Sequence, residues 1–454
     1  MIRTAHIGVG GMGKADLNDI ASHKKVNVVA LCDVDSKALQ VASEEFPDAK
    51  TFRDYRKMFN EFSENIDAVI ISTPDHTHAP ASILAMNNNK HVYCQKPLTH
   101  HVSEAREMKR LAEEKNLITQ MGIQVHSFYD YKLATLLIQD GLIGKVSRVR
   151  AWCPKNWGYD GPEATGQDTV PENLDWNLWL GTAKERPYKD KIYHPGMWRK
   201  LVDFGCGTLG DMGVHIFDTP YNALNLDVPL TIKNKCRKPN GFGFPENNYV
   251  EYEFPGTEYT TEKLTWIWED GKGSPSNHKD LKLPNKDKLP LQGAMFIGEN
   301  GKKLLLPHFM ELPKFINNGN YEEFDVTEFV EKGELSEIPV RDYGGESYLH
   351  YHQFIDTCLG KDECSAPFSY SARLTETILL GVIAGNFPGK KLHWDSKNAR
   401  FEEEEANQFL DSKYKINGKV ITPSDKSFNT GFPSLFLDEV ISKISSCIWY
   451  AIPK

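Results

Sequence analysis

A lysine between a glutamine and a proline is the first feature of this chain that could take part in chemistry. Lys96 stands in the sequence "HVYCQKPLTHH", at the end of an apolar strand predicted over 90–95. Pro97 removes a backbone donor and biases Lys96 toward extended geometry, so the ammonium is expected at the end of that strand. A cation held there could polarise a substrate hydroxyl or help to deprotonate it. Lys96 is therefore a candidate catalytic residue, and a surface lysine without a role is the alternative.

A second candidate pair lies in the glycine-rich sequence "GCGTLGDMGVHIFD" at 205–218. If a helix begins near Thr208, Asp211 and His215 stand four residues apart on one face of it. An aspartate beside a histidine can fix the orientation of the ring and stabilise its cationic form after proton uptake. The pair suits general base catalysis, which contributes about 10²- to 10⁴-fold in rate. The alternative is a surface pair, and Asp218, one turn further, is as readily structural.

Glycines at a strand–helix turn indicate a dinucleotide site near the N-terminus. The sequence "GVGGMG" has the pattern G-x-G-x-x-G and joins a strand predicted over 4–10 to a helix predicted over 12–22. Such glycines permit a tight turn and close backbone approach, and the helix N-terminus offers free N–H groups to a pyrophosphate. Glycines also end strands for simple turn reasons, so the strand–turn–helix context gives the pattern its weight. The predicted cofactor contacts in this loop are Gly8, Gly10, Gly11, Met12 and Gly13.

Asp33 indicates which dinucleotide the loop would bind. It ends the strand predicted over 26–33 and comes 20 residues after Gly13. An acidic residue at this point accepts hydrogen bonds from the adenosine ribose diol. It would also repel a 2′-phosphate, since two unit charges about 4 Å apart interact by roughly 4 kcal/mol at an intermediate effective dielectric. The predicted cofactor is therefore NAD rather than NADP, and a simple turn-capping role for Asp33 is the alternative.

The sequence "STPDHTH" follows another buried strand, predicted over 67–73. Loops after parallel strands line the ligand crevice, so Thr73 and Pro74 are expected along the cofactor. His76 and His78 could suggest a metal, but no matching cluster of carboxylates or cysteines lies nearby in the sequence. We therefore predict no metal site and interpret these histidines as loop packing or cofactor contact, with His78 as the cofactor contact.

Aromatic residues crowd the segment before Asp211. Five of the nine tryptophans fall between 152 and 198, and a Pro- and Gly-rich segment runs over about 154–205. Aromatic rings beside a polar site suit the apolar faces of sugars, but a long segment also needs large apolar anchors to stay folded. The better candidates for substrate contact lie just before the Asp211 helix or just after the strand predicted over 117–123: His126, Tyr193, His194, Trp198 and Arg199.

The elements that must position these residues follow two patterns. Through about residue 123, continuous apolar strands alternate with amphipathic helices, which is typical of a doubly wound parallel sheet. After a helix at 128–144 and a strand at 145–153, alternating apolar and polar residues predict an antiparallel sheet. Helices near 346–360 and 369–386 complete the globular body. The predicted fold class is therefore α/β, with a second domain built on a mainly antiparallel sheet.

Composition excludes several classes of protein. The chain has 454 residues, 53 basic and 62 acidic side chains, and a net charge of −9, which argues against a nucleic-acid partner. No apolar run approaches the roughly 18 to 20 residues that a membrane helix needs. The first strand starts close to Met1, so no signal peptide is expected and the predicted location is the cytoplasm. The eight cysteines form no C-x-x-C pair and fit reduced, mostly packed thiols.

The motifs "GVGGMG", "TPDHTH", "QKP" and "GTLGDMGVHIFD", taken in order, resemble those of the glucose–fructose oxidoreductase/inositol dehydrogenase (Gfo/Idh/MocA) family. The resemblance covers residues 1 to about 395, and "WNLWLGTAKERPY" and "HPGMWR" are similar to a longer branch with an enlarged middle region. It implies a Rossmann domain and a C-terminal α/β domain with a large open sheet. It also implies a homo-oligomer (dimer or tetramer) and reversible hydride transfer at a carbinol carbon of a sugar, cyclitol or related polyol.

The resemblance also implies roles for individual residues. Lys96 matches the lysine of the family's Glu-Lys-Pro motif. Asp211 and His215 match its aspartate and histidine, the histidine usually being assigned the proton transfer. Gln95 departs from the usual glutamate, which contacts the nicotinamide ribose. The amide can still form a hydrogen bond there but brings no charge, so Gln95 and Lys96 are both expected to contact the cofactor.

Three segments are expected along the chain. Residues 1–124 form the NAD-binding Rossmann domain, residues 125–395 a substrate and oligomerisation domain, and residues 396–454 a tail to which no role is assigned. The tail includes the acidic sequence "FEEEEA". It ends in apolar residues whose spacing favours a terminal helix packed on the body: Leu437, Val440, Ile441, Ile444 and Ile448.

Three functions are compatible with these features. The first is NAD-dependent oxidation of a sugar or polyol, with His215 as the base, oriented by Asp211 and assisted by Lys96. The second is a glycosidase that oxidises and re-reduces its sugar with a retained NAD, as some members of the family do. Gln95 and the aromatic segment are compatible with it, but the Tyr-Pro-Thr-His-Gly type segment of the best-known such relatives is absent. The third is a non-catalytic NAD or sugar sensor, against which the joint presence of Lys96, Asp211 and His215 argues.

Overall fold

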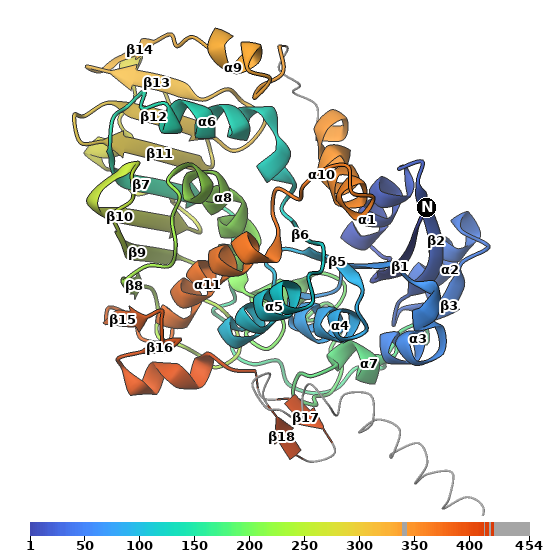
Figure 1. Ribbon diagram of the computed structural model, residues 1–454. Helices are drawn as coiled ribbons and strands as arrows, with labels where there is room; N and C mark the ends of the chain where they lie inside the picture. The colour runs from blue at the N-terminus through green and yellow to red at the C-terminus, as the bar shows by residue number, and fades with distance from the viewer. Residues whose placement is uncertain (338–342, 413, 417–418, 422–454) are drawn as a thin grey trace, which may run out of the picture.

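The computed structural model describes residues 1–337, 343–412, 414–416 and 419–421 of the chain. Within them, two large sheets and their covering helices make up the body of the molecule (Figure 1). Every helix in these ranges is too short or too polar to span a bilayer. The predicted terminal helix that carries Leu437, Val440, Ile441, Ile444 and Ile448 lies outside the described residues.

A six-stranded parallel sheet forms the N-terminal domain, as predicted. Its order is β3-β2-β1-β4-β5-β6, with bounds β1 Ile2–Ile7, β2 Val26–Cys32, β3 Lys50–Phe52, β4 Ala68–Ile71, β5 His91–Gln95 and β6 Thr119–Gly122. All four residues of β4 are buried, which is typical of a parallel sheet covered on both faces. The strand order reverses between β1 and β4, and in this fold ligands bind beyond the carboxyl ends of the strands at that point.

Five helices connect these strands: α1 Met12–Ala21, α2 Ser36–Glu45, α3 Tyr55–Phe62, α4 Asp75–Asn87 and α5 Val102–Glu114. The side chain of Asp35 caps α2 by accepting a hydrogen bond from Lys37 N. Strand β3 and helix α3 fall in a stretch for which the sequence patterns predicted no element. The other elements of this domain follow the prediction.

A ten-stranded sheet forms the second domain (Figure 1). The order is β14-β13-β12-β11-β7-β10-β9-β8-β15-β16, with bounds β7 Val146–Cys153, β8 Thr231–Lys235, β9 Asn248–Pro255, β10 Thr260–Asp270, β11 Gly293–Gly298, β12 Lys303–Pro307, β13 Lys314–Asn317, β14 Asn320–Glu322, β15 Lys391–Asp395 and β16 Arg400–Phe401. Only β7 and β10 pair in parallel among these neighbours, so the sheet is mainly antiparallel, as predicted. A separate two-stranded sheet pairs β17 (Tyr414–Ile416) with β18 (Lys419–Ile421).

Helices cover one face of the large sheet and reach back to the first domain (Figure 1). The remaining helices are α6 Tyr129–Gln139, α7 Trp176–Leu180, α8 Val214–Ala223, α9 Thr327–Glu331, α10 Tyr343–Cys358 and α11 Phe368–Ala384. The α8 side chain Phe217 stacks on Trp266 of β10 with ring centroids 4.3 Å apart, and both are fully buried. Such aromatic burial supplies much of the free energy that holds a helix on a sheet.

Two helices of the second domain pack directly against the first domain. Helix α10 contacts α1, and its Tyr351 stacks on Tyr93 of β5 at 5.1 Å between ring centroids. Helix α11 contacts α5, where Arg106 donates two hydrogen bonds to the fully buried Glu376 carboxylate, at 2.9 and 2.6 Å. Because β6 ends at 122 and α6 begins at 129, we propose the domain boundary near 124–125.

The aromatic segment, residues 154–205, crosses from the large sheet to the first domain. Ser36 N donates to Asn173 O at 2.8 Å, and Asp175 N donates to Val34 O at 3.0 Å. These contacts place the segment over the turn between β2 and α2. Its core is an aromatic cluster that includes Trp179, Tyr188, Tyr193, Trp198 and Phe204.

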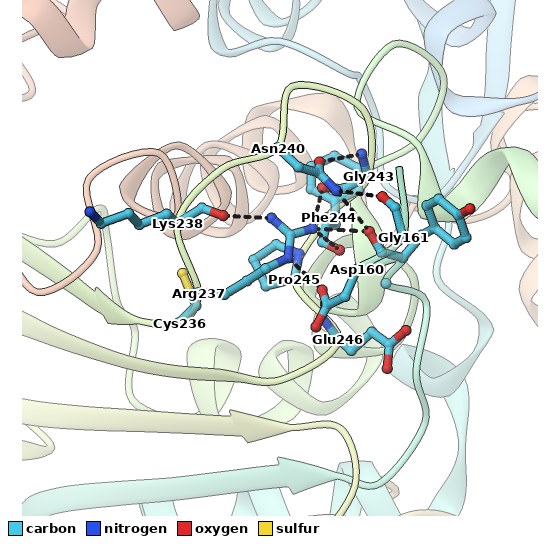
Figure 2. A network of polar contacts seen from close by, with 12 residues as sticks. Asp160, Gly161, Cys236, Arg237, Lys238, Asn240, Gly243, Phe244, Pro245 and Glu246 are labelled. Atoms are coloured by element: carbon cyan, nitrogen blue, oxygen red, sulfur yellow. Dashed lines mark hydrogen bonds and ion pairs between the residues drawn. The ribbon is translucent and has the colours of Figure 1, made fainter. Parts of the chain in front are cut away.

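One arginine joins this segment to the loop between β8 and β9. Figure 2 shows the guanidinium of Arg237 bonded to the Asp160 carboxylate and to main-chain oxygens. The oxygens belong to Tyr159, Gly243 and Phe244, at 3.0, 2.8 and 3.1 Å from Nη2. A planar group with five N–H donors can satisfy several acceptors at once, so Arg237 fixes the start of the aromatic segment.

Replacing Arg237 tests that role. Arg237→Met is expected to cost about 2 to 4 kcal/mol of local stability, because four carbonyls and a carboxylate lose a charged donor. The expected result is faster limited proteolysis within 154–205 and a lower urea midpoint. Lys238→Met is the matched control, since this neighbouring side chain is exposed. Equal proteolysis of the two variants would contradict the assignment.

Candidate active site

The glycine loop after β1 is shaped for close contact with a ligand. A Cβ at Gly8 would lie 2.7 Å from Ser72 O, and one at Gly13 would lie 2.1 Å from Gly8 O. No side chain tolerates such contacts, and the positive φ angles of Gly8 (85°) and Gly11 (53°) also favour glycine. Gly10, Gly11 and Met12, at the start of α1, line the cavity, and a glycine loop at a helix N-terminus fits a pyrophosphate.

Asp33 is held beside this loop by backbone donors. Its Oδ2 accepts from Val9 N at 2.8 Å and its Oδ1 from Asp35 N at 2.8 Å. Burial raises the pKa of Asp33, and these two hydrogen bonds oppose that effect. The nearby Arg53 guanidinium donates to Val34 O at 2.6 Å, so it is already engaged. The arrangement suits an adenosine ribose diol better than a 2′-phosphate.

A cavity of about 860 Å³ begins at the glycine loop and ends in the second domain. That volume lies within the range of about 300 to 1,000 Å³ that is usual for ligand pockets. Its lining combines the carboxyl edge of the parallel sheet, the aromatic segment, the helix with His215 and the residues after β12. The predicted cofactor residues that line it are Gly8, Gly10, Gly11, Met12, Asp33, Thr73, Pro74, His78, Gln95 and Lys96. Gly13 is buried behind the loop, where it allows α1 to pack on Gly8.

The two histidines after β4 are engaged in packing. His78 lies between two main-chain oxygens, with Nδ1 2.8 Å from Pro97 O and Nε2 2.8 Å from Thr73 O, and a neutral ring donates to one of them at a time. Burial lowers the pKa of His78 to about 4, so the ring is neutral at physiological pH. His76 lies against Trp179, whose main-chain oxygen is 3.2 Å from its Nε2. Over the described ranges, the structure contains no group of three or more His, Cys, Asp or Glu that could hold a metal ion.

Gln95 is bonded to a buried carboxylate that the sequence patterns did not reveal. Its Nε2 donates to both Asp16 oxygens, each at 3.0 Å. Ser72 Oγ and Tyr351 Oη donate to the same carboxylate at 2.5 and 2.6 Å. Burial raises the pKa of Asp16 to about 6, although these donors partly offset it. A glutamate at position 95 would face a second carboxylate here, which gives a physical reason for the amide.

Lys96 is paired with Asp211 across the domain junction. Its Nζ donates to Asp211 Oδ1 at 2.8 Å and to Asp211 O at 3.0 Å. Arg199 Nε donates to the same Oδ1 at 3.3 Å. Burial would raise the pKa of Asp211, but the charges of Lys96 and Arg199 outweigh it and hold that pKa well below the usual range. Asp211 therefore remains a carboxylate and fixes the ammonium at the cavity, which Lys96 lines and Asp211 does not.

The helix that carries Asp211 and His215 contains a π-helical turn at Leu209–Gly213, which leads directly into α8. In this turn Val214 N bonds to Leu209 O, five residues back. The wider turn changes the offset between neighbouring turns, so the expected i, i+4 alignment of an α-helix does not apply. Among the described residues no hydrogen bond joins Asp211 to His215, since the carboxylate points to Lys96 and Arg199. Asp211 thus positions the lysine rather than the histidine.

His215 lines the cavity as a neutral imidazole. Burial lowers the pKa of His215 well below its usual range, and the charges of Lys96 and of His308 act in the same direction. The Asp211 carboxylate opposes them without reversing the result. His215 Nδ1 is buried and has no hydrogen-bond partner among the described residues, which leaves Nε2 as the nitrogen available to a ligand. A neutral imidazole in this position can accept a proton.

The predicted substrate residues divide into two groups. His194, Trp198 and Arg199 line the cavity. Tyr193 is buried inside the aromatic cluster instead, 5.6 Å from Phe204 between ring centroids.

His126 also lies away from the cavity lining, in a separate polar cluster. Its Nδ1 is 2.9 Å from an Asp218 oxygen, and Tyr370 Oη donates to Asp218 at 2.7 Å. Asp218 therefore has a structural environment, which was one of its two readings from the sequence.

Several lining residues were not predicted. His308, which follows β12, contacts the Tyr131 hydroxyl through Nδ1, and its ring lies 6.0 Å from that of His215 between centroids. Lys155, which follows β7, lies with Nζ 3.3 Å from Met212 Sδ. Neither residue belongs to a sequence pattern, because only the tertiary fold brings the ends of β7 and β12 to this cavity. Asp16 left a weak signal, as an acid between buried positions of an amphipathic helix.

Introducing a carboxylate at position 95 tests the contact between Gln95 and Asp16. Gln95→Glu would place two carboxylates about 3 Å apart, and at an intermediate dielectric their repulsion amounts to about 5 kcal/mol. One carboxyl should then retain its proton, so the folded state binds more protons than the unfolded one. The urea midpoint of this variant should fall, relative to that of the native chain, as pH rises from 5.5 to 8. The double variant Asp16→Asn/Gln95→Glu transposes the amide and the acid and should recover most of the loss; a midpoint as low as that of Gln95→Glu alone would contradict the pairing.

Two family models match the chain. The model described as oxidoreductase family, NAD-binding Rossmann fold, matches residues 2–123. The model described as oxidoreductase family, C-terminal alpha/beta domain, matches residues 121–240. Both are models of the Gfo/Idh/MocA family, and together they cover more than half of the 454 residues.

Individual relatives agree with this match. Inositol 2-dehydrogenase of Salmonella typhimurium is 29% identical over 205 residues, which are 43% of this chain and 58% of that protein. A glycosyl hydrolase family 109 protein of Shewanella pealeana is 28% identical over 154 residues, which are 32% of this chain and 33% of that protein. This chain therefore spans less than two thirds of the length of these relatives.

A solved structure of levoglucosan dehydrogenase with NADH and L-sorbose has the same fold, with a TM-score of 0.61 at 16% identity over 86% of this chain and 98% of that one. The glycine loop, the two sheets and both family models are consistent with the same family. The chain belongs to the Gfo/Idh/MocA family of oxidoreductases, and its N-terminal domain is the family's NAD-binding Rossmann domain.

Proposed function

We propose that the protein is an NAD-dependent oxidoreductase that transfers hydride between nicotinamide and a carbinol carbon of a sugar or polyol. The observation that supports this most is that Lys96 and His215, which come from different domains, line one cavity together with the glycine loop. The relative named inositol 2-dehydrogenase is consistent with a polyhydroxylated substrate. The expected homo-oligomer stays a prediction.

The residues of the cavity fit NAD. The glycine loop and the start of α1 would hold the pyrophosphate, Asp33 the ribose diol, and Gln95 and Lys96 the nicotinamide end. When bound there, NAD supplies the hydride acceptor for oxidation of a carbinol.

The side chains divide the proton chemistry between them. His215 takes the hydroxyl proton at Nε2, since its lowered pKa keeps the ring neutral and ready to accept it. Lys96 Nζ gives two hydrogen bonds to Asp211, so one N–H remains for the substrate oxygen. Asp211 keeps that ammonium in place and stays ionised while His215 becomes charged. Removal of a proton from the hydroxyl and stabilisation of the resulting oxygen are thus assigned to two different residues.

Replacing His215 tests this assignment. His215→Gln should lower kcat for sugar or polyol oxidation by about 10²- to 10⁴-fold, because the general base is lost. Binding of NADH, measured by nucleotide fluorescence, should change little, because the pyrophosphate and the ribose diol are assigned to the glycine loop and to Asp33 rather than to His215. His352→Gln, on α10 and outside the cavity lining, is the control.

The pH profile of the native protein gives a second readout. His215 acts as a base only when unprotonated, and its pKa is depressed, so kcat/KM for oxidation should show no loss near the ordinary histidine pKa of about 6.5. Full activity of His215→Gln, or strong NADH-binding loss with no change in kcat, would contradict the proposed role.

A redox-neutral glycosidase is the second candidate, and the relative named as a glycosyl hydrolase family 109 protein favours it. The same groups would then oxidise and re-reduce one sugar during hydrolysis. Cleavage of a nitrophenyl glycoside without net formation of NADH would support this candidate. Accumulation of NADH with a free sugar or polyol would support the oxidoreductase.

A further inference from the structure

The part of the cavity around His215 carries more positive than negative charge. Lys96, Lys155 and Arg199 contribute cations, whereas the Asp211 carboxylate is the nearest fully ionised acid. Asp75 also lines the cavity, but burial raises its pKa to about 7 against the opposing charges of Arg199 and Lys96. Asp75 is therefore only partly ionised near neutral pH. One carboxylate and a fraction of another leave at least one cation uncompensated.

Arg199 is rigid and has donors to spare. Its guanidinium lies 4.2 Å from the Trp198 ring centroid and 5.7 Å from that of Trp157. Nε bonds to Asp211, whereas the two terminal nitrogens have no hydrogen-bond acceptor in the described part of the chain. A guanidinium fixed by stacking, with a free fork of N–H groups, matches the geometry of a carboxylate or phosphate.

Lys155, which follows β7, lines the same cavity. Its Nζ rests against Met212 Sδ at 3.3 Å, and within the described ranges no carboxylate lies within 4.0 Å of it. Lys155, His215 and His308 line one cavity, and the charge of Lys155 contributes to lowering the pKa of both histidines. Lys155 is an exposed residue of the cavity lining, so its ammonium is open to a ligand.

Clustered cations without partners are unfavourable unless something compensates them. Lys96 and Arg199 are partly buried, whereas Lys155 is exposed. Repulsion among these like charges costs free energy, most of all between the partly buried ones, and an anionic ligand reduces that cost. The glycine loop already provides for a pyrophosphate at the far end of the cavity, so these cations need a different anion. A neutral sugar would leave Arg199 and Lys155 solvated only by water.

We propose that the substrate carries a carboxylate or a phosphate and that Arg199 and Lys155 bind this group. The substrate class is therefore a sugar acid or a sugar phosphate rather than a neutral sugar or cyclitol. This proposal rests on the proposed function only in identifying the bound anion as the substrate. The anion site itself is a property of the cavity and can be measured without turnover.

The test compares matched ligands by calorimetry on the full chain saturated with NADH. D-glucose, D-glucuronate and D-glucose 6-phosphate share one ring and differ in charge, so they separate carboxylate from phosphate recognition. At least one anionic sugar should bind about 10- to 100-fold more tightly than glucose, the range expected for one or two charge-assisted hydrogen bonds. Lys155→Met should remove most of that preference, and Lys155→Arg should retain it. Lys361→Met, an exposed lysine outside the cavity lining, is the control and should leave the preference as it is.

Each result decides the proposal. Tighter binding of an anionic sugar that depends on the charge at position 155 supports it, even if no sugar is oxidised; in that case only the proposed function fails. Equal binding of the three sugars, no detectable binding of either anionic sugar, or a preference that Lys155→Met leaves intact would overturn it. Oxidation of neutral sugars alone would likewise overturn it while leaving the proposed function in place.

Discussion

The ion pair between Lys96 and Asp211 is the interaction on which the site depends. The lysine ends a strand of the parallel sheet, and the aspartate belongs to the helix that packs on the second sheet. The two groups are 2.8 Å apart, with side chains only 15% and 13% exposed. Breaking such a pair would leave two partly buried charges without compensation, so it fixes the distance between the domains. The contacts of α10 with α1 and of α11 with α5 support the same relative placement.

A second buried carboxyl group, that of Asp16, is bonded to Ser72 and Gln95, which line the cavity. Asp16 collects donors from Ser72, Gln95 and Tyr351, and these come from both domains. The Gln95 amide therefore has a structural role, because it donates hydrogen bonds to the buried Asp16 carboxylate. The family's usual acid is absent at position 95, but the Asp16 carboxylate lies 3.0 Å from the Gln95 amide nitrogen.

Local sequence signals predicted some of these features and missed others for identifiable reasons. The glycine loop, Asp33 and Lys96 each sit at a strand end, where spacing along the chain determines position, and the structure places all of them on one cavity. The sequence patterns did not predict Asp16, His308 and Lys155, because only the folded and packed sheets bring these residues to the site. The geometry of Asp211 relative to His215 was expected from an α-helix, but a π-helical turn redirects the carboxylate to Lys96. The aromatic segment mixes both roles: Tyr193 anchors its core, while Trp198 reaches the cavity.

The proposed hydride and proton transfer require one pocket to hold the nicotinamide ring between Lys96 and His215. A crystal structure of the NAD complex measures this directly. We expect C4 of the nicotinamide to face an open space bordered by Lys96 Nζ and His215 Nε2, with the pyrophosphate on the glycine loop. A nicotinamide bound elsewhere, or a complex in which these two side chains border different spaces, would contradict the account.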